Sequence, residues 1–98
     1  MRIEFARTGG FAGISLRVAF ESGALPAGER KTLELLIEQS RFFELPTELS
    51  GPQPDAFQYD LVIESDGNRH EVRADDLAAP DELKPLLRKL TELAREMR

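Results

Sequence analysis

The sequence predicts an α+β domain in which a four-stranded antiparallel sheet carries two helices on one face. Four short segments alternate apolar and polar residues with a period of two, which is typical of strands with one buried face. Two longer segments place apolar residues at helical spacing, so that each helix has one apolar stripe to bury. Glycine-, proline- or aspartate-rich runs separate the segments, and the elements follow one another in the order β-β-α-β-β-α.

The N-terminal part is predicted to be a hairpin of two strands. In residues 2–7, Ile3 and Phe5 alternate with more polar neighbours, and residues 14–21 alternate in the same way with larger apolar side chains. The run 8–13 between them holds three glycines within five residues. Because glycine adopts positive φ angles readily, this run is predicted to form a wide hairpin loop.

The middle of the chain is predicted to hold the first helix and a stiff loop. Leu33 and Leu36 recur at helical spacing within residues 29–40, and Pro46 prevents the helix from continuing. A loop is predicted over Gly51–Ala56, where two prolines restrict the backbone.

The second half is predicted to repeat the pattern with two strands and a helix. Strands are expected over 57–64 and 68–74, joined by Asp66-Gly67, the strongest short hairpin signal in the chain. The acids at 75–76 are interpreted as solvated linker residues whose carboxylates diverge. The final helix is predicted to start after Asp81 as its N-cap.

The composition excludes several functional classes. The chain has 98 residues, a length that predicts one domain over 1–98. With no cysteine and one histidine, it offers no disulfide framework, thiolate zinc site or His-rich metal site. The net charge of −5 disfavours nucleic acid and anionic membranes as partners, since phosphate binding depends on clustered Lys and Arg.

No membrane or secretory segment is recognisable in the sequence. No apolar run approaches the roughly 20 residues that span a membrane, and the N-terminal residues have no apolar core of a signal peptide. We therefore expect a cytoplasmic protein.

No catalytic constellation emerges from the residues. None of the serines lies in a nucleophile elbow. The glycines at 9–13 lead into a strand, whereas a phosphate cradle needs a helix N-terminus after them. His70 falls on the apolar side of its strand and is interpreted as a structural residue. A small hydrolase or isomerase that uses His70 is the remote alternative.

Phe11, inside the glycine run, is the most informative single residue. At a hairpin tip, a phenylalanine either folds back onto the core or anchors in the pocket of a partner, because buried aromatic anchors dominate interface energetics. The residues alone leave both interpretations open.

The chain resembles the emfourin family along nearly its whole length. The matching segments are Met1–Glu4 with Arg7–Ile14, Phe42–Pro46, Pro52–Tyr59 and Pro80–Leu87. The most specific stretches are Gly-Gly-Phe-Ala-Gly and Asp-x-Phe-x-Tyr. Emfourins are small inhibitors of thermolysin-like zinc metalloproteases of the protealysin type, and they are commonly encoded beside such a protease in bacteria.

The resemblance implies a protease inhibitor rather than an enzyme, and we expect it to be a monomer. It implies competitive binding over the active-site cleft with no cofactor or metal of its own, because the zinc belongs to the target. Thermolysin-like enzymes favour a bulky apolar side chain just after the scissile bond, so Phe11 is predicted to enter that pocket. One loop would not fill a standard interface of about 800 Å² per partner, which makes the 51–56 loop the second candidate contact. The predicted protease-binding residues are Gly9, Gly10, Phe11, Ala12, Gly13, Pro52, Gln53, Pro54 and Asp55.

A second hypothesis is a non-inhibitory binding module, such as an adaptor or immunity-type protein, that uses the polar face of the sheet. The residues that would then matter are Arg2, Glu4, Arg17, Glu21, Gln58 and Asp60. The strand order, which the alternation pattern does not supply, decides whether the two predicted loops share one end of the sheet.

Overall fold

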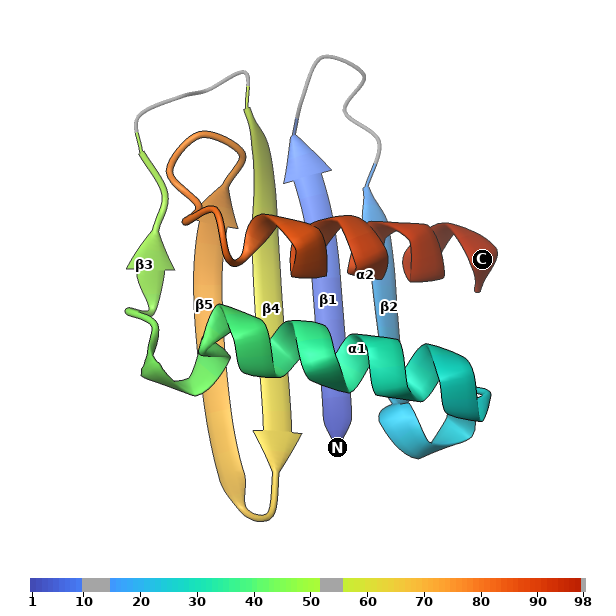
Figure 1. The fold of residues 1–98 in the computed structure, drawn as a ribbon. Helices are drawn as coiled ribbons and strands as arrows, with labels where there is room; N and C mark the ends of the chain where they lie inside the picture. The colour runs from blue at the N-terminus through green and yellow to red at the C-terminus, as the bar shows by residue number, and fades with distance from the viewer. Residues whose placement is uncertain (10–14, 52–55, 98) are drawn as a thin grey trace.

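The computed structural model, which describes residues 1–9, 15–51 and 56–97, is a five-stranded sheet with two helices packed against one face (Figure 1). The strands are β1 (Arg2–Gly9), β2 (Leu16–Glu21), β3 (Glu48–Leu49), β4 (Phe57–Ser65) and β5 (Asn68–Asp75). The helices are α1 (Ala27–Ser40) and α2 (Lys84–Glu96), with 3₁₀ turns η1 (Ser22–Ala24) and η2 (Phe42–Glu44). None of these helices is long and apolar enough to cross a membrane.

The strand order is β2-β1-β4-β5-β3, which corrects the predicted sheet. The four predicted strands pair antiparallel, but β3 adds a fifth strand that runs parallel to β5. The expectation of four antiparallel strands in the order β-β-α-β-β-α was therefore wrong by this one element. Two residues are too short to show a period of two, and β3 exists only because the chain returns to the edge of β5, where the Arg73 N–H donates to the Thr47 carbonyl at 2.8 Å.

The core lies between the sheet and the two helices, on the faces that the alternation predicted. Ile3 of β1 and Ile63 of β4 are both 0% exposed. Leu33 of α1 and Leu90 of α2 are also 0% exposed and close the core from the helix side. The observed burial of these side chains thus confirms the faces that the apolar patterns predicted to be buried.

The start of α2 differs from the predicted one. The helix begins at Lys84, after Leu83, and no side chain caps it. Asp81 instead forms an ion pair with the Lys84 ammonium at 3.4 Å. This later start keeps Pro85 within the first helical turn, where its missing N–H is not required.

The predicted hairpin turn between β4 and β5 is confirmed. Asp66 and Gly67 have φ angles of 51° and 82°. Two consecutive positive φ angles define the type I′ turn, whose twist matches that of the flanking strands.

Replacing Gly67 by alanine tests this turn. Gly67→Ala is expected to lower the free energy of unfolding by about 1 kcal/mol, because an L-residue is strained in the left-handed region. The measurement is urea unfolding. Gly28→Ala, in the first turn of α1 with no atom within 4 Å of the added methyl, is the control and should be neutral or slightly stabilising. Equal losses in both variants would contradict the turn assignment.

Candidate functional site

The described residues that border both predicted contact loops lie at the same end of the sheet. Gly9, the last residue of β1, pairs with Phe57, the first residue of β4. On the other side of β4, Gln58 pairs with Asp75 at the end of β5. We call this end, formed by Gly9, Gly51, Ala56, Phe57 and the β5–α2 turn at 75–79, the loop end (Figure 1). The strand order thereby answers the question that the sequence left open.

Of the nine predicted protease-binding residues, Gly9 alone belongs to the described part of the chain. Gly9 is exposed and has a φ of +84°, and a Cβ placed there would lie 3.2 Å from the carbonyl oxygen of Ala56. The backbone approach between β1 and the residue that precedes β4 therefore requires glycine. The residues that lie outside the described ranges are Gly10, Phe11, Ala12, Gly13, Pro52, Gln53, Pro54 and Asp55.

Asp75 is fully buried at the loop end, so its interpretation as a solvated linker acid was wrong. Its Oδ2 accepts a hydrogen bond from the Gly51 N–H at 2.6 Å. Its Oδ1 accepts from the N–H groups of Leu77 at 2.8 Å and Ala78 at 2.6 Å. These N–H donors, Gly51 foremost, hold the pKa of Asp75 below its ordinary value. One carboxylate therefore joins Gly51 to the β5–α2 turn.

Asp76 makes the corresponding contacts on the other side of the 52–55 segment. Its Oδ2 accepts from the Phe57 N–H at 3.3 Å, and its Oδ1 accepts from the Tyr59 hydroxyl at 2.7 Å. The Asp76 N–H also donates to the Phe57 carbonyl at 3.3 Å. The adjacent carboxylates diverge as predicted: Asp75 accepts from Gly51, which precedes the 52–55 segment, and Asp76 accepts from Phe57, two residues after that segment.

Aromatic side chains complete the loop end on the β1 side. The guanidinium carbon of Arg7 lies 4.2 Å from the ring centroid of Phe57, a cation–π contact. The Tyr59 ring stacks on Phe5 with centroids 6.0 Å apart. Burial, together with the hydrogen bond and negative charge of Asp76, raises the pKa of Tyr59 to about 12.

The Asp75–Asp76 pair is the feature of the loop end that the sequence analysis misinterpreted. An aspartate whose carboxylate accepts the N–H groups two and three residues later is a known turn pattern, and Asp75 followed by Leu77 and Ala78 fits it. The bond to Gly51, 24 residues away, has no local signal in the sequence.

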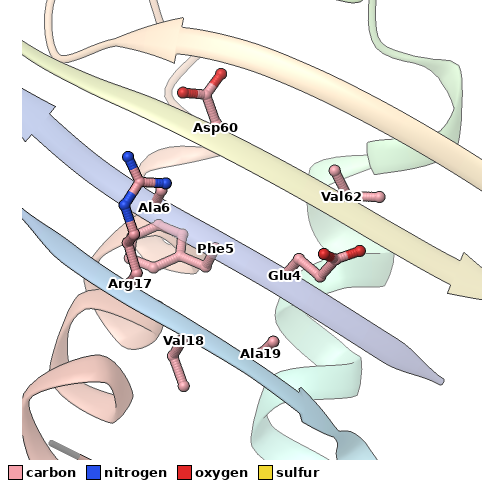
Figure 2. A pocket seen from close by; sticks show the side chains of 8 residues that line it. All are labelled: Glu4, Phe5, Ala6, Arg17, Val18, Ala19, Asp60 and Val62. Atoms are coloured by element: carbon pink, nitrogen blue, oxygen red, sulfur yellow. The ribbon is translucent and has the colours of Figure 1, made fainter.

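The face of the sheet that the helices leave open carries a shallow depression of about 380 Å³ (Figure 2). Its floor includes small or apolar side chains of three neighbouring strands, and the charges of Glu4, Arg17 and Asp60 surround it. Asp60 is also paired with Arg73, at 2.9 Å. The lining residues are Glu4, Phe5, Ala6, Arg17, Val18, Ala19, Asp60 and Val62.

His70, the remaining candidate for a catalytic role, makes structural contacts. His70 is half-buried, its Nε2–H donates to the Leu45 carbonyl at 2.7 Å, and its ring packs edge-on against Phe42 with centroids 5.4 Å apart. These contacts support the structural interpretation of His70. Within residues 1–9, 15–51 and 56–97, no group of three or more His, Cys, Asp or Glu side chains is placed to hold a metal ion.

Tyr59 supplies a spectroscopic test of the loop end, because it is the one tyrosine of the chain and the chain has no tryptophan. Absorbance at the phenolate band should report a pKa of about 12 for Tyr59. Asp76→Asn is expected to move this pKa toward the ordinary value by removing the negative charge, with burial retaining part of the shift. A wild-type pKa near 10 would contradict the Tyr59–Asp76 contact.

The same shift predicts how stability depends on alkaline pH. The unfolded state loses the Tyr59 proton near pH 10, whereas the folded state keeps it until about pH 12. Between these values the unfolded state binds fewer protons, so this contribution to stability is present below pH 10 and is lost as pH rises. Tyr59→Phe should abolish this part of the decline, measured by urea unfolding at pH 9–12; an unchanged profile would contradict the assignment.

Comparison with known proteins places the chain in a family. The family described as Emfourin matches residues 5–91, which is most of the 98-residue chain. The chain has no match among the curated proteins or among the solved structures. Emfourin is a family of protease inhibitors, not of enzymes, and membership indicates a metalloprotease-inhibitor role in general with a protease as the partner. Because this match covers most of the sequence, the chain belongs to the Emfourin family.

Proposed function

We propose that the chain inhibits a thermolysin-like zinc metalloprotease of the protealysin type by covering its active-site cleft with the loop end. The Gly9–Gly13 loop supplies one contact and the Gly51–Ala56 loop supplies the other. The observation that carries this proposal is the contact of Gly9 with Ala56 at one end of the sheet, in a member of an inhibitor family. Two adjacent segments suit an interface of about 800 Å² per partner better than one loop does.

The mechanism assigns Phe11 to the apolar pocket that receives the residue after the scissile bond, with the 52–55 segment as the second contact. The catalytic zinc belongs to the target, and the inhibitor supplies no metal or cofactor. Gly51 and Phe57 are each hydrogen-bonded to a carboxylate. Fixing the residues on both sides of a contact segment lowers the conformational entropy lost on binding, which strengthens the complex.

The same proposal covers the finer properties of the chain. Residues 1–98 act as one inhibitor domain, as a monomer, in the cytoplasm of a bacterium that also makes the target protease. A monomer is consistent with competitive binding, because the loop end of one inhibitor molecule covers the active-site cleft of one protease molecule.

The open sheet face supports a second candidate function, a non-inhibitory binding module. Its depression combines an apolar floor with charges of both signs, Glu4 and Asp60 against Arg17. Such a surface suits a protein partner with complementary charges. The two candidates use different surfaces and are therefore separable by substitution.

Titration of a thermolysin-like protease with this protein tests the first candidate. After preincubation, peptide cleavage should fall in proportion to added inhibitor and reach a plateau near one inhibitor per protease. A competitive pattern against peptide substrate is expected. Absence of inhibition of several such proteases at excess protein would overturn the proposed function.

Paired variants identify the surface. Gly10→Asp combined with Phe11→Ala should raise the inhibition constant by about 100-fold, because it removes an aromatic anchor and adds a charge. Arg17→Ala, on the open sheet face, is the control and should inhibit like the wild type. The opposite result, loss with Arg17→Ala and none with the loop variant, would favour the binding module.

A further inference from the structure

An exposed leucine stands at the loop end, outside both predicted contact loops. Leu77, in the turn between β5 and α2, is 67% exposed, more than any other large hydrophobic side chain of the described residues. The turn lies at the same end of the sheet as the last residue of β1 (Figure 1). A single exposed leucine is common on protein surfaces, so its meaning depends on how it is held.

The turn that carries Leu77 is held by Asp75. The Asp75 carboxylate accepts the N–H groups of Leu77 and Ala78, and the Asp75 carbonyl accepts the Ala79 N–H at 3.1 Å. Ala79 is 5% exposed and fixes the far side of the turn to the core. The Leu77 backbone is thus fastened on both sides while its side chain faces solvent, the arrangement of a preorganised apolar anchor.

The same carboxylate also holds Gly51, which precedes the 52–55 segment. Asp75 therefore sets the position of the turn relative to Gly51, the first residue of the predicted 51–56 loop. Leu35, the next most exposed leucine of the described residues at 53%, lies on α1, which is not part of the loop end.

We propose that the β5–α2 turn is a third segment of the protease-binding surface, with Leu77 as its contact and Asp75 as its positioning residue. This inference rests on the proposed function, and its partner is the same zinc metalloprotease, which meets Leu77 with an apolar patch beside its cleft. Asp75 touches no partner and acts through Leu77 and Gly51.

Substitution of Leu77 tests the contact. Leu77→Asp should raise the inhibition constant at least about tenfold, because it places a charge in an apolar contact. Leu77→Met keeps an apolar side chain and should retain most of the inhibition. Leu35→Asp is the matched control and should inhibit like the wild type. Thermal unfolding checks that all three variants are folded. Wild-type inhibition by Leu77→Asp would overturn the inference and leave the proposed function intact.

Asp75→Asn tests the positioning role. Within the described residues, the side-chain hydrogen bonds of Asp75 all come from N–H donors. An asparagine that keeps its oxygen toward Leu77 and Ala78 must therefore turn its amino group toward the Gly51 N–H. We expect faster hydrogen exchange at Gly51 and an inhibition constant raised about tenfold. Asp60→Asn, which removes a charge paired with Arg73 on the open face, is the control and should change neither readout.

A double-variant cycle separates positioning from general destabilisation. If Asp75 acts partly through Leu77, the two substitutions are not independent. The inhibition constant of the Asp75→Asn, Leu77→Asp double variant should then rise by a smaller factor than the product of the two single-variant factors. Full multiplication of the two effects, or unchanged inhibition by Asp75→Asn, would overturn the positioning role. A wild-type protein that inhibits no thermolysin-like protease would instead overturn the proposed function, and this inference with it.

Discussion

The antiparallel pairing of β1 with β4 is the constraint on which the rest of the structure depends. These strands are not consecutive in the chain, yet their register runs from Arg2 opposite Glu64 to Gly9 opposite Phe57. This pairing joins the N-terminal hairpin and the β4–β5 hairpin into one sheet. It also determines the end of the sheet at which the chain leaves β1 and enters β4. A change of one residue in this register would move Ile3 and Ile63 out of the core, so burial of the core and alignment of the loop end depend on the same contact.

The loop end shows how a buried charge is accommodated in a small domain. Removing a carboxylate from water is costly unless its oxygens are hydrogen-bonded. Asp75 satisfies this condition with backbone donors on both sides, from Gly51 and from the turn that follows β5. Because Gly51 is distant in sequence from Leu77 and Ala78, the carboxylate holds Gly51 and the β5–α2 turn together. The two helices cover one face of the sheet and leave the loop end and the opposite face available for partners (Figure 1).

The sequence pattern correctly predicted the elements that are set by residues close together in the chain. The Asp66-Gly67 turn follows from residues that tolerate positive φ, and the buried faces of β1 and β4 follow from alternation. β3 could not be predicted, because two residues carry no period and their pairing partner is Arg73 and its neighbour in β5. Asp81 was predicted as the N-cap of α2, but the helix begins at Lys84, because Pro85 is accommodated only within the first helical turn.

The sequence by itself determined the class of fold, the buried faces, the turn between β4 and β5 and the resemblance to an inhibitor family, since each of these is encoded by residues near one another or by a continuous motif. Only the tertiary structure decided that Gly9 lies against Ala56 and that Asp75 joins Gly51 to Leu77. Such contacts depend on the order of the strands in the sheet, and strand order arises from the packing of the whole core rather than from the preference of any one segment.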